Sequence, residues 1–146
     1  MPVGTLSTTR EPDALDPVMV HPPKNIEERL RDVIESLRSV PGFVSAAVTR
    51  RDGLVIKHSF ARVREAAGLC AMAAAMVGAA RATGVELGQG VPEYGFFQFH
   101  SGILVIQDAG PEAILACLIR KDTDLGVAIP HISHASDTIR ETLEAL

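Results

Sequence analysis

Five histidines are the residues of this chain that could hold a metal ion. His131 and His134 stand three positions apart, on what we expect to be one helix. A structural zinc site usually needs four ligands and a catalytic one three, and no cysteine or carboxylate cluster stands at a matching spacing. We therefore predict no metal site and expect solvated histidines near a helix end. His58 and His100 lie in or beside predicted strands, and we interpret them as edge or interface residues.

Two cysteines, Cys70 and Cys117, are the candidate thiol nucleophiles. Such a nucleophile needs an exposed thiol near a base. Both cysteines lie inside apolar runs, so we expect small buried side chains in a reducing compartment, with a disulfide improbable.

Two further segments suggest phosphate chemistry. The glycine-rich segment 84–90 lacks a following Gly-Lys-Ser/Thr and does not join a strand to a helix, so we interpret it as a helix stop and a loop. Arg50 and Arg51, beside Asp52, could stabilise a phosphate on a partner, although a solvated turn is the simpler interpretation. Acidic residues are scattered, without a pair placed for acid and base roles. We predict no catalytic residue, no cofactor and no enzyme activity.

The composition supports a single folded domain. The chain has 146 residues, 47% of them hydrophobic, and can fill one core without metal or disulfide support. The net charge of −4 argues against nucleic acid as a partner, because phosphate neutralisation needs a basic face. We see no signal-peptide pattern at the N-terminus and expect a cytoplasmic location.

The chain divides into an arm and a domain. Residues 1–24 hold five of the nine prolines and show no periodicity, which predicts a flexible arm, either a solvated tail or a partner-binding segment. The domain is predicted to span 25–146. It begins with the capping-box pattern of Asn25 and Glu28, followed by a helical apolar stripe to Leu37 and a stop at Pro41-Gly42.

Strand patterns follow in hairpins. The predicted order is helix, two strands, helix, three strands, helix, which favours an α/β (α+β) fold with a five-stranded antiparallel sheet. Pro130 is expected in the first turn of the last helix, or to kink it. The predicted strands are 43–50, 54–60, 93–100, 103–107 and 113–120, and the last helix carries a stripe from Ile132 to Leu146.

The helix predicted from Val63 to Thr83 is unusual because it has no charge between Ala66 and Ala80. Fifteen uncharged residues are too few to span a bilayer, so we predict no membrane insertion. At about 100° per residue the run separates into two arcs. A bulky arc is predicted to cover the sheet: Leu69, Cys70, Met72, Ala73, Met76, Val77 and Ala80. The opposite arc is small: Ala67, Gly68, Ala71, Ala74, Ala75 and Gly78.

The small arc lacks the lysine, glutamate or glutamine of a solvated helix side. Alanine and glycine let two backbones approach closely, so the same helix of a second copy is one candidate cover. An exposed alanine-rich face, or cover by the chain's own first or last helix, are the alternatives.

The ordered segments "SVPGFVSAAVTRRDGLVI", "LCAMAAAMVGAA" and "GILVIQDAGPEAILACLIRKDTDLG" resemble the roadblock family. That family is named for a dynein light chain and includes bacterial and archaeal regulators of Ras-like GTPases. The resemblance covers about Asn25 to Leu146. Two features depart from the pattern: Pro130, and the proline-rich arm.

The resemblance implies a profilin-like sheet between helices, and homodimers in which the central helices pair and the sheet continues through its third strand. It implies a non-enzymatic homodimer that regulates a Ras-like small GTPase or serves as a scaffold. The alternatives are a nucleotide-independent scaffold subunit and a small-ligand-sensing domain. The candidate dimer-interface residues are Ala67, Ala71, Ala74, Ala75, Gly78, Tyr94 and Phe96, and the candidate partner contacts are Arg64, Arg81 and Arg51.

Overall fold

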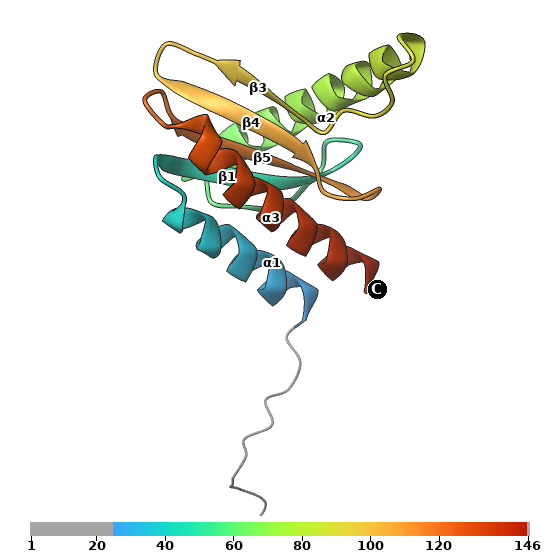
Figure 1. Ribbon diagram of the computed structural model, residues 1–146. Helices are drawn as coiled ribbons and strands as arrows, with labels where there is room; N and C mark the ends of the chain where they lie inside the picture. Colours follow the sequence, from blue (N-terminus) through green and yellow to red (C-terminus); the bar gives the residue numbers. More distant parts are fainter. Residues whose placement is uncertain (1–24, 146) are drawn as a thin grey trace, which may run out of the picture.

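The computed structural model describes residues 25–145 (Figure 1). The predicted arm, residues 1–24, lies outside the described residues, as does Leu146. The elements in chain order are α1 (Ile26–Ser36), a 3-10 turn (Leu37–Ser39), β1 (Phe43–Arg50), β2 (Val55–His58), α2 (Val63–Glu86), β3 (Tyr94–Gln98), β4 (Gly102–Asp108), β5 (Ala113–Arg120) and α3 (Leu125–Glu144).

The five strands form one antiparallel sheet in the order β2-β1-β5-β4-β3. Helices α1 and α3 cover one face of the sheet and α2 crosses the other (Figure 1). The predicted fold class and element order are confirmed. The order leaves β2 and β3 as the two edges of the sheet.

Helix α1 begins where the capping box predicts. The Asn25 side chain accepts a hydrogen bond from the Glu28 N–H at 2.8 Å, and the Glu28 carboxylate accepts one from the Asn25 N–H at 3.2 Å. The helix ends at Ser36 and tightens into the 3-10 turn before Gly42, whose φ is +79°. Only glycine adopts that conformation without strain.

The core on the α1/α3 face joins helix stripes to alternate strand residues. The fully buried residues that pack in one cluster with Leu115 of β5 include Leu30 of α1, Leu37 of the 3-10 turn, and Ile132 and Ile139 of α3. Each such side chain removes apolar area from water, worth about 1.5–3 kcal/mol. This face therefore supplies most of the burial that holds the domain together.

Helix α3 begins earlier than the sequence indicated. Asp124 caps it by accepting a hydrogen bond from the Gly126 N–H at 2.9 Å. Pro130 therefore lies inside the helix and not in its first turn, which corrects the predicted start. The carbonyl that would accept from residue 130 belongs to exposed Gly126, where water can replace the missing donor.

Helix α2 is longer than its uncharged run. It has 24 residues and, by length and composition alone, could cross a membrane, which corrects the expectation of too short a segment. One side of it packs on β1, β5, β2 and β4 of the same domain.

Candidate partner-binding surface

The sheet-facing side of α2 is narrow and built from small residues. Ala66, Cys70, Ala73 and Val77 recur at intervals of four, three and four residues, and all are buried. Ala73 and Val77 pack on a cluster formed by Leu104, Ile106, Ile114 and Ala116 of the sheet. Because the contact residues are small, the helix lies close to the strands.

The bulky arc is only partly correct. Leu69 and Met76 are half-buried against the sheet cluster, as predicted. Met72 is 44% exposed and Ala80 is exposed, so neither covers the sheet. The buried line is centred between Ala66 and Cys70, about 50° from the centre of the predicted arc.

The opposite side of α2 is uncovered by any other part of the described chain. Ala74 is half-buried, whereas the other predicted interface residues on this helix are exposed: Ala67, Ala71, Ala75 and Gly78. With exposed Met72 they make an apolar strip that we call the α2 face. Pairing of this face with a second copy stays a prediction.

The two flanks of α2 point to different surroundings. On one flank, the Gly53 turn lies against the backbone of Ala71, and Arg81 reaches Asp108 at the end of β4. On the other flank, Met76 and Ala80 point toward β3. A second copy that approaches along β3 therefore meets the Met72/Met76 flank first.

Strand β3 carries exposed aromatic side chains on both faces of the sheet. Phe96 pairs with Val105, which belongs to the core under α3, so Tyr94 and Phe96 lie on the α1/α3 face. Phe97 pairs with Leu104 of the cluster beneath α2 and therefore lies on the face of the sheet that α2 crosses. All three are close to half exposed, because β3 is an edge strand that neither layer of helices reaches.

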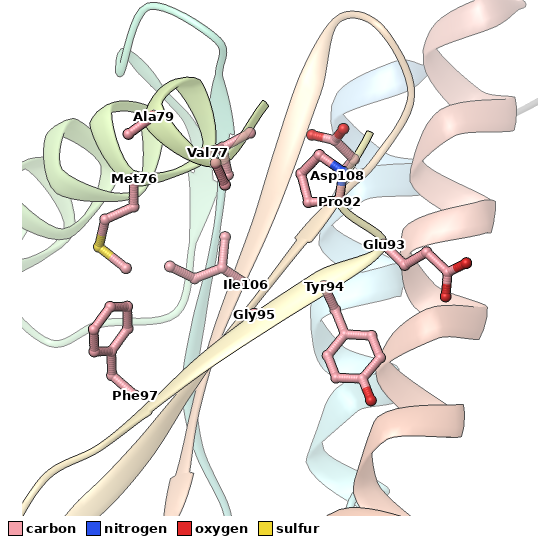
Figure 2. Close-up of a pocket in the computed structure, with 11 residues that line it drawn as sticks. Met76, Val77, Ala79, Pro92, Glu93, Tyr94, Gly95, Phe97, Ile106 and Asp108 are labelled. Atoms are coloured by element: carbon pink, nitrogen blue, oxygen red, sulfur yellow. The ribbon is translucent and has the colours of Figure 1, made fainter. Parts of the chain in front are cut away.

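A groove of about 310 Å³ separates the C-terminal half of α2 from β3. Met76, Val77 and Ile106 line it, with Phe97 pointing toward Met76 across the opening (Figure 2). The lining is almost wholly apolar and opens at the sheet edge. The α2 face, the groove and β3 thus form one continuous apolar surface.

Two of the predicted partner contacts, Arg51 and Arg81, form ion pairs within the domain. The Asp108 carboxylate lies 2.7 Å from Arg81 Nη1 and 2.9 Å from Arg51 Nη2. Arg51 also donates hydrogen bonds of 2.8 Å to the carbonyls of Gly110 and Pro111. Asp108 therefore joins the β1–β2 turn, α2 and the β4–β5 turn, whereas Arg64 is exposed.

The two cysteines are buried in the core, and two of the histidines lie on the surface. Cys70 and Cys117 are fully buried. Burial raises the pKa of the Cys117 thiol to about 12. Burial also raises the pKa of Cys70, and a hydrogen bond with Thr49 partly opposes this. His131 and His134 are exposed on α3, and residues 25–145 contain no cluster of three potential metal ligands.

Sequence reasoning missed Phe97, Phe99 and Asp108. Strand alternation would have placed Phe97 and Phe99 on the face opposite to Tyr94 and Phe96. Asp108 ends a strand in an ordinary turn sequence, so its two arginine partners, 27 and 57 positions away, carry no local signal.

Comparison with known proteins shows which family the sequence matches and which solved structures share its fold. A sequence profile of the Roadblock/LC7 domain matches residues 30–119. Two uncharacterized proteins of Methanocaldococcus jannaschii are each 32% identical over 108 residues, which cover 74% of this chain and 94% of each relative.

Solved structures agree in fold. The gliding protein MglB from Thermus thermophilus superimposes with a TM-score of 0.76 at 23% identity, over 90% of this chain and all of that one. A Roadblock/LC7 domain from Streptomyces avermitilis gives 0.72 at 21% identity, over 83% of this chain and 99% of that one. The profile match and the two relatives show that the chain belongs to the Roadblock/LC7 family.

Proposed function

We propose that the protein is a non-enzymatic, cytoplasmic homodimer that binds and regulates a Ras-like small GTPase. One observation carries the proposal: an exposed α2 face without charge from Ala66 to Ala80, continuous with the aromatic edge strand β3. Large contiguous apolar surfaces of this kind mark protein interaction sites.

A twofold arrangement satisfies this surface. Antiparallel pairing of β3 with the β3 of a second copy satisfies the open N–H and C=O groups of the edge. The same operation brings the two α2 helices together along their Met72/Met76 flanks, and each apolar groove is then closed by the other copy. Self-complementary pairing is the usual form of a homodimer interface.

Regulation then needs no catalytic group from this protein. A partner that binds one conformation of a GTPase more tightly shifts the population toward that conformation. The paired α2 helices are the platform we assign to the GTPase, with exposed Arg64 at the N-terminal end of each helix as a candidate contact. Membership of the Roadblock/LC7 family supports this assignment, because the family includes regulators of Ras-like GTPases.

A pull-down tests the proposal. Small GTPases from the same genome, loaded with GDP or a GTP analogue, are passed over the immobilised protein. We expect one of them to bind in a manner that depends on the nucleotide. Binding that is indifferent to the nucleotide would favour a scaffold subunit, and the absence of any GTPase binder would contradict the proposal.

The apolar groove favours a second candidate function, the sensing of a small apolar ligand, since pockets of about 300–1,000 Å³ hold such molecules. Thermal unfolding across a metabolite panel distinguishes the two functions, because a bound ligand raises the apparent stability.

A further inference from the structure

The α1/α3 face of β3 is a second uncovered surface, on the side of the sheet opposite to the α2 face. Tyr94 and Phe96 project there, each with nearly half of its surface exposed. One strand further in, their neighbour Val105 is fully buried beneath α3. The helix layer therefore ends between β4 and β3.

The position of α3 defines the width of this surface. Its strand contacts lie on β5 and β4, so its axis runs near the boundary between these two strands. In a dimer joined through β3, the two α3 helices are separated by four strand spacings. At about 4.8 Å per spacing this separation is about 19 Å.

That separation matches a single helix. Helices that pack side by side have interaxial distances of about 8–10 Å, so one helix between two others needs about 16–20 Å. The floor of the space is aromatic, with Tyr94 and Phe96 from each copy, and its walls are the two α3 helices. We call this space the seam groove. It does not exist in a single copy, because one wall and half of the floor come from the second.

The rim of the seam groove carries an exposed carboxylate. Glu93, next to Tyr94, is exposed and its carboxylate points to the α3 side of β3 (Figure 2). Of the neighbouring charges, Arg140 pairs with Asp137, whereas Arg81 and Arg51 share the single carboxylate of Asp108. A helix with lysine or arginine beside its apolar stripe complements this rim.

We propose that the homodimer binds one amphipathic, basic-flanked helix of a partner protein in the seam groove, over the joined β3 strands. This inference rests on the dimer proposed above. It adds a docking site on the side away from the GTPase platform, with a stoichiometry of one helix per two chains. Both surfaces can then be occupied at the same time.

Tyr94 gives a direct measurement, since it is the single tyrosine of a chain without tryptophan. The probe is a designed 18-residue peptide with leucines on one helical face, lysines beside them, and no aromatic residue. We expect titration to change the Tyr94 fluorescence of the full-length protein, with saturation at one peptide per two chains. A matched peptide with glutamates in place of the lysines should bind at least tenfold more weakly.

Two aromatic variants locate the site. Phe96→Ala should weaken peptide binding at least tenfold, because it removes a floor residue from both copies. Phe99→Ala removes an equally exposed aromatic outside β3 and should leave the affinity within about twofold. Equal effects of both variants would overturn the assignment of the groove.

Light scattering on the same samples separates the two proposals. A dimer that fails to bind the lysine peptide, or binds one peptide per chain, overturns the seam groove and leaves the dimer standing. A monomeric wild type overturns the dimer itself. Displacement of the probe by a synthetic peptide of residues 1–24 would assign the groove to the chain's own N-terminal segment and would also overturn a partner helix.

Discussion

At the scale of single residues, the charges of this domain serve its own architecture more than the sequence indicated. Arg51 and Arg81 stood out as candidate partner contacts because they lie in a turn and beside an uncharged run. Both bind the carboxylate of Asp108, whose side chain is largely shielded from water, and their role as partner contacts stays a prediction. Long-range pairing of this kind leaves no periodic trace in a sequence, whereas the local Asn25/Glu28 capping box was readable.

Replacing Asp108 should destabilise the domain. Asp108→Asn removes the charge partner of two guanidinium groups and should lower the free energy of unfolding by about 1–3 kcal/mol. Urea unfolding measures the change. The matched control is Asp122→Asn, which breaks an exposed pair with Arg120 at 3.5 Å and should change stability by less than about 0.5 kcal/mol. Equal losses in both variants would contradict a structural role for Asp108.

The two thiols should be unreactive in the folded chain. At pH 8, a thiol reagent should modify Cys70 and Cys117 rapidly in urea and hardly at all in buffer, because both are buried and protonated. Their pKa values are raised in the folded chain above the ordinary value of about 8.5, so this contribution to stability is fully present below that pH. It should be lost as the pH rises toward about 12, the pKa of folded Cys117. Rapid labelling of either thiol in buffer would show that its burial is wrong.

At the scale of elements, periodicity predicted which helices and strands form, but not which side of α2 packs on the sheet. The bounds of β1 and β5 agree with the pattern to the residue, because alternation and flanking turns coincide there. The contact face of α2 was displaced because alanine and glycine give little contrast between its sides. Tertiary packing then selected the line through Ala66, Cys70 and Ala73, which hydrophobicity alone does not distinguish.

The glycines of α2 should respond in opposite directions to alanine. A Cβ at Gly84 would collide with the carbonyl oxygen of Gly90, in the loop that folds back to donate two N–H bonds to the Gly84 carbonyl. Gly84→Ala should therefore destabilise by about 1–3 kcal/mol. A Cβ added at Gly68 would have no atom from outside its own helix backbone within 4 Å. Gly68→Ala should therefore raise the free energy of unfolding by about 0.5–1 kcal/mol, because alanine has the higher helix propensity. Thermal unfolding measures both, and a shift of the same sign in both would contradict the packing described for the end of α2.

At the scale of the whole molecule, the domain has one well-buried face and one exposed apolar surface. The core beneath α1 and α3 is closed, whereas the α2 face, its groove and β3 remain uncovered. The sequence predicted this asymmetry from the absence of charge in α2. The direction from which a second copy approaches could not be predicted, because it depends on the diagonal path of α2 across the sheet.

The most direct test of the account is the mass of the protein in solution, measured by light scattering at micromolar concentration. We predict twice the 15.6 kDa of one chain for the wild type. Ala75→Glu, which adds a charge to the α2 face, should give a folded monomer. Ala145→Glu, the same change at the exposed end of α3, should remain a dimer. A monomeric wild type, or an Ala75→Glu variant as dimeric as its control, would contradict the pairing of this face.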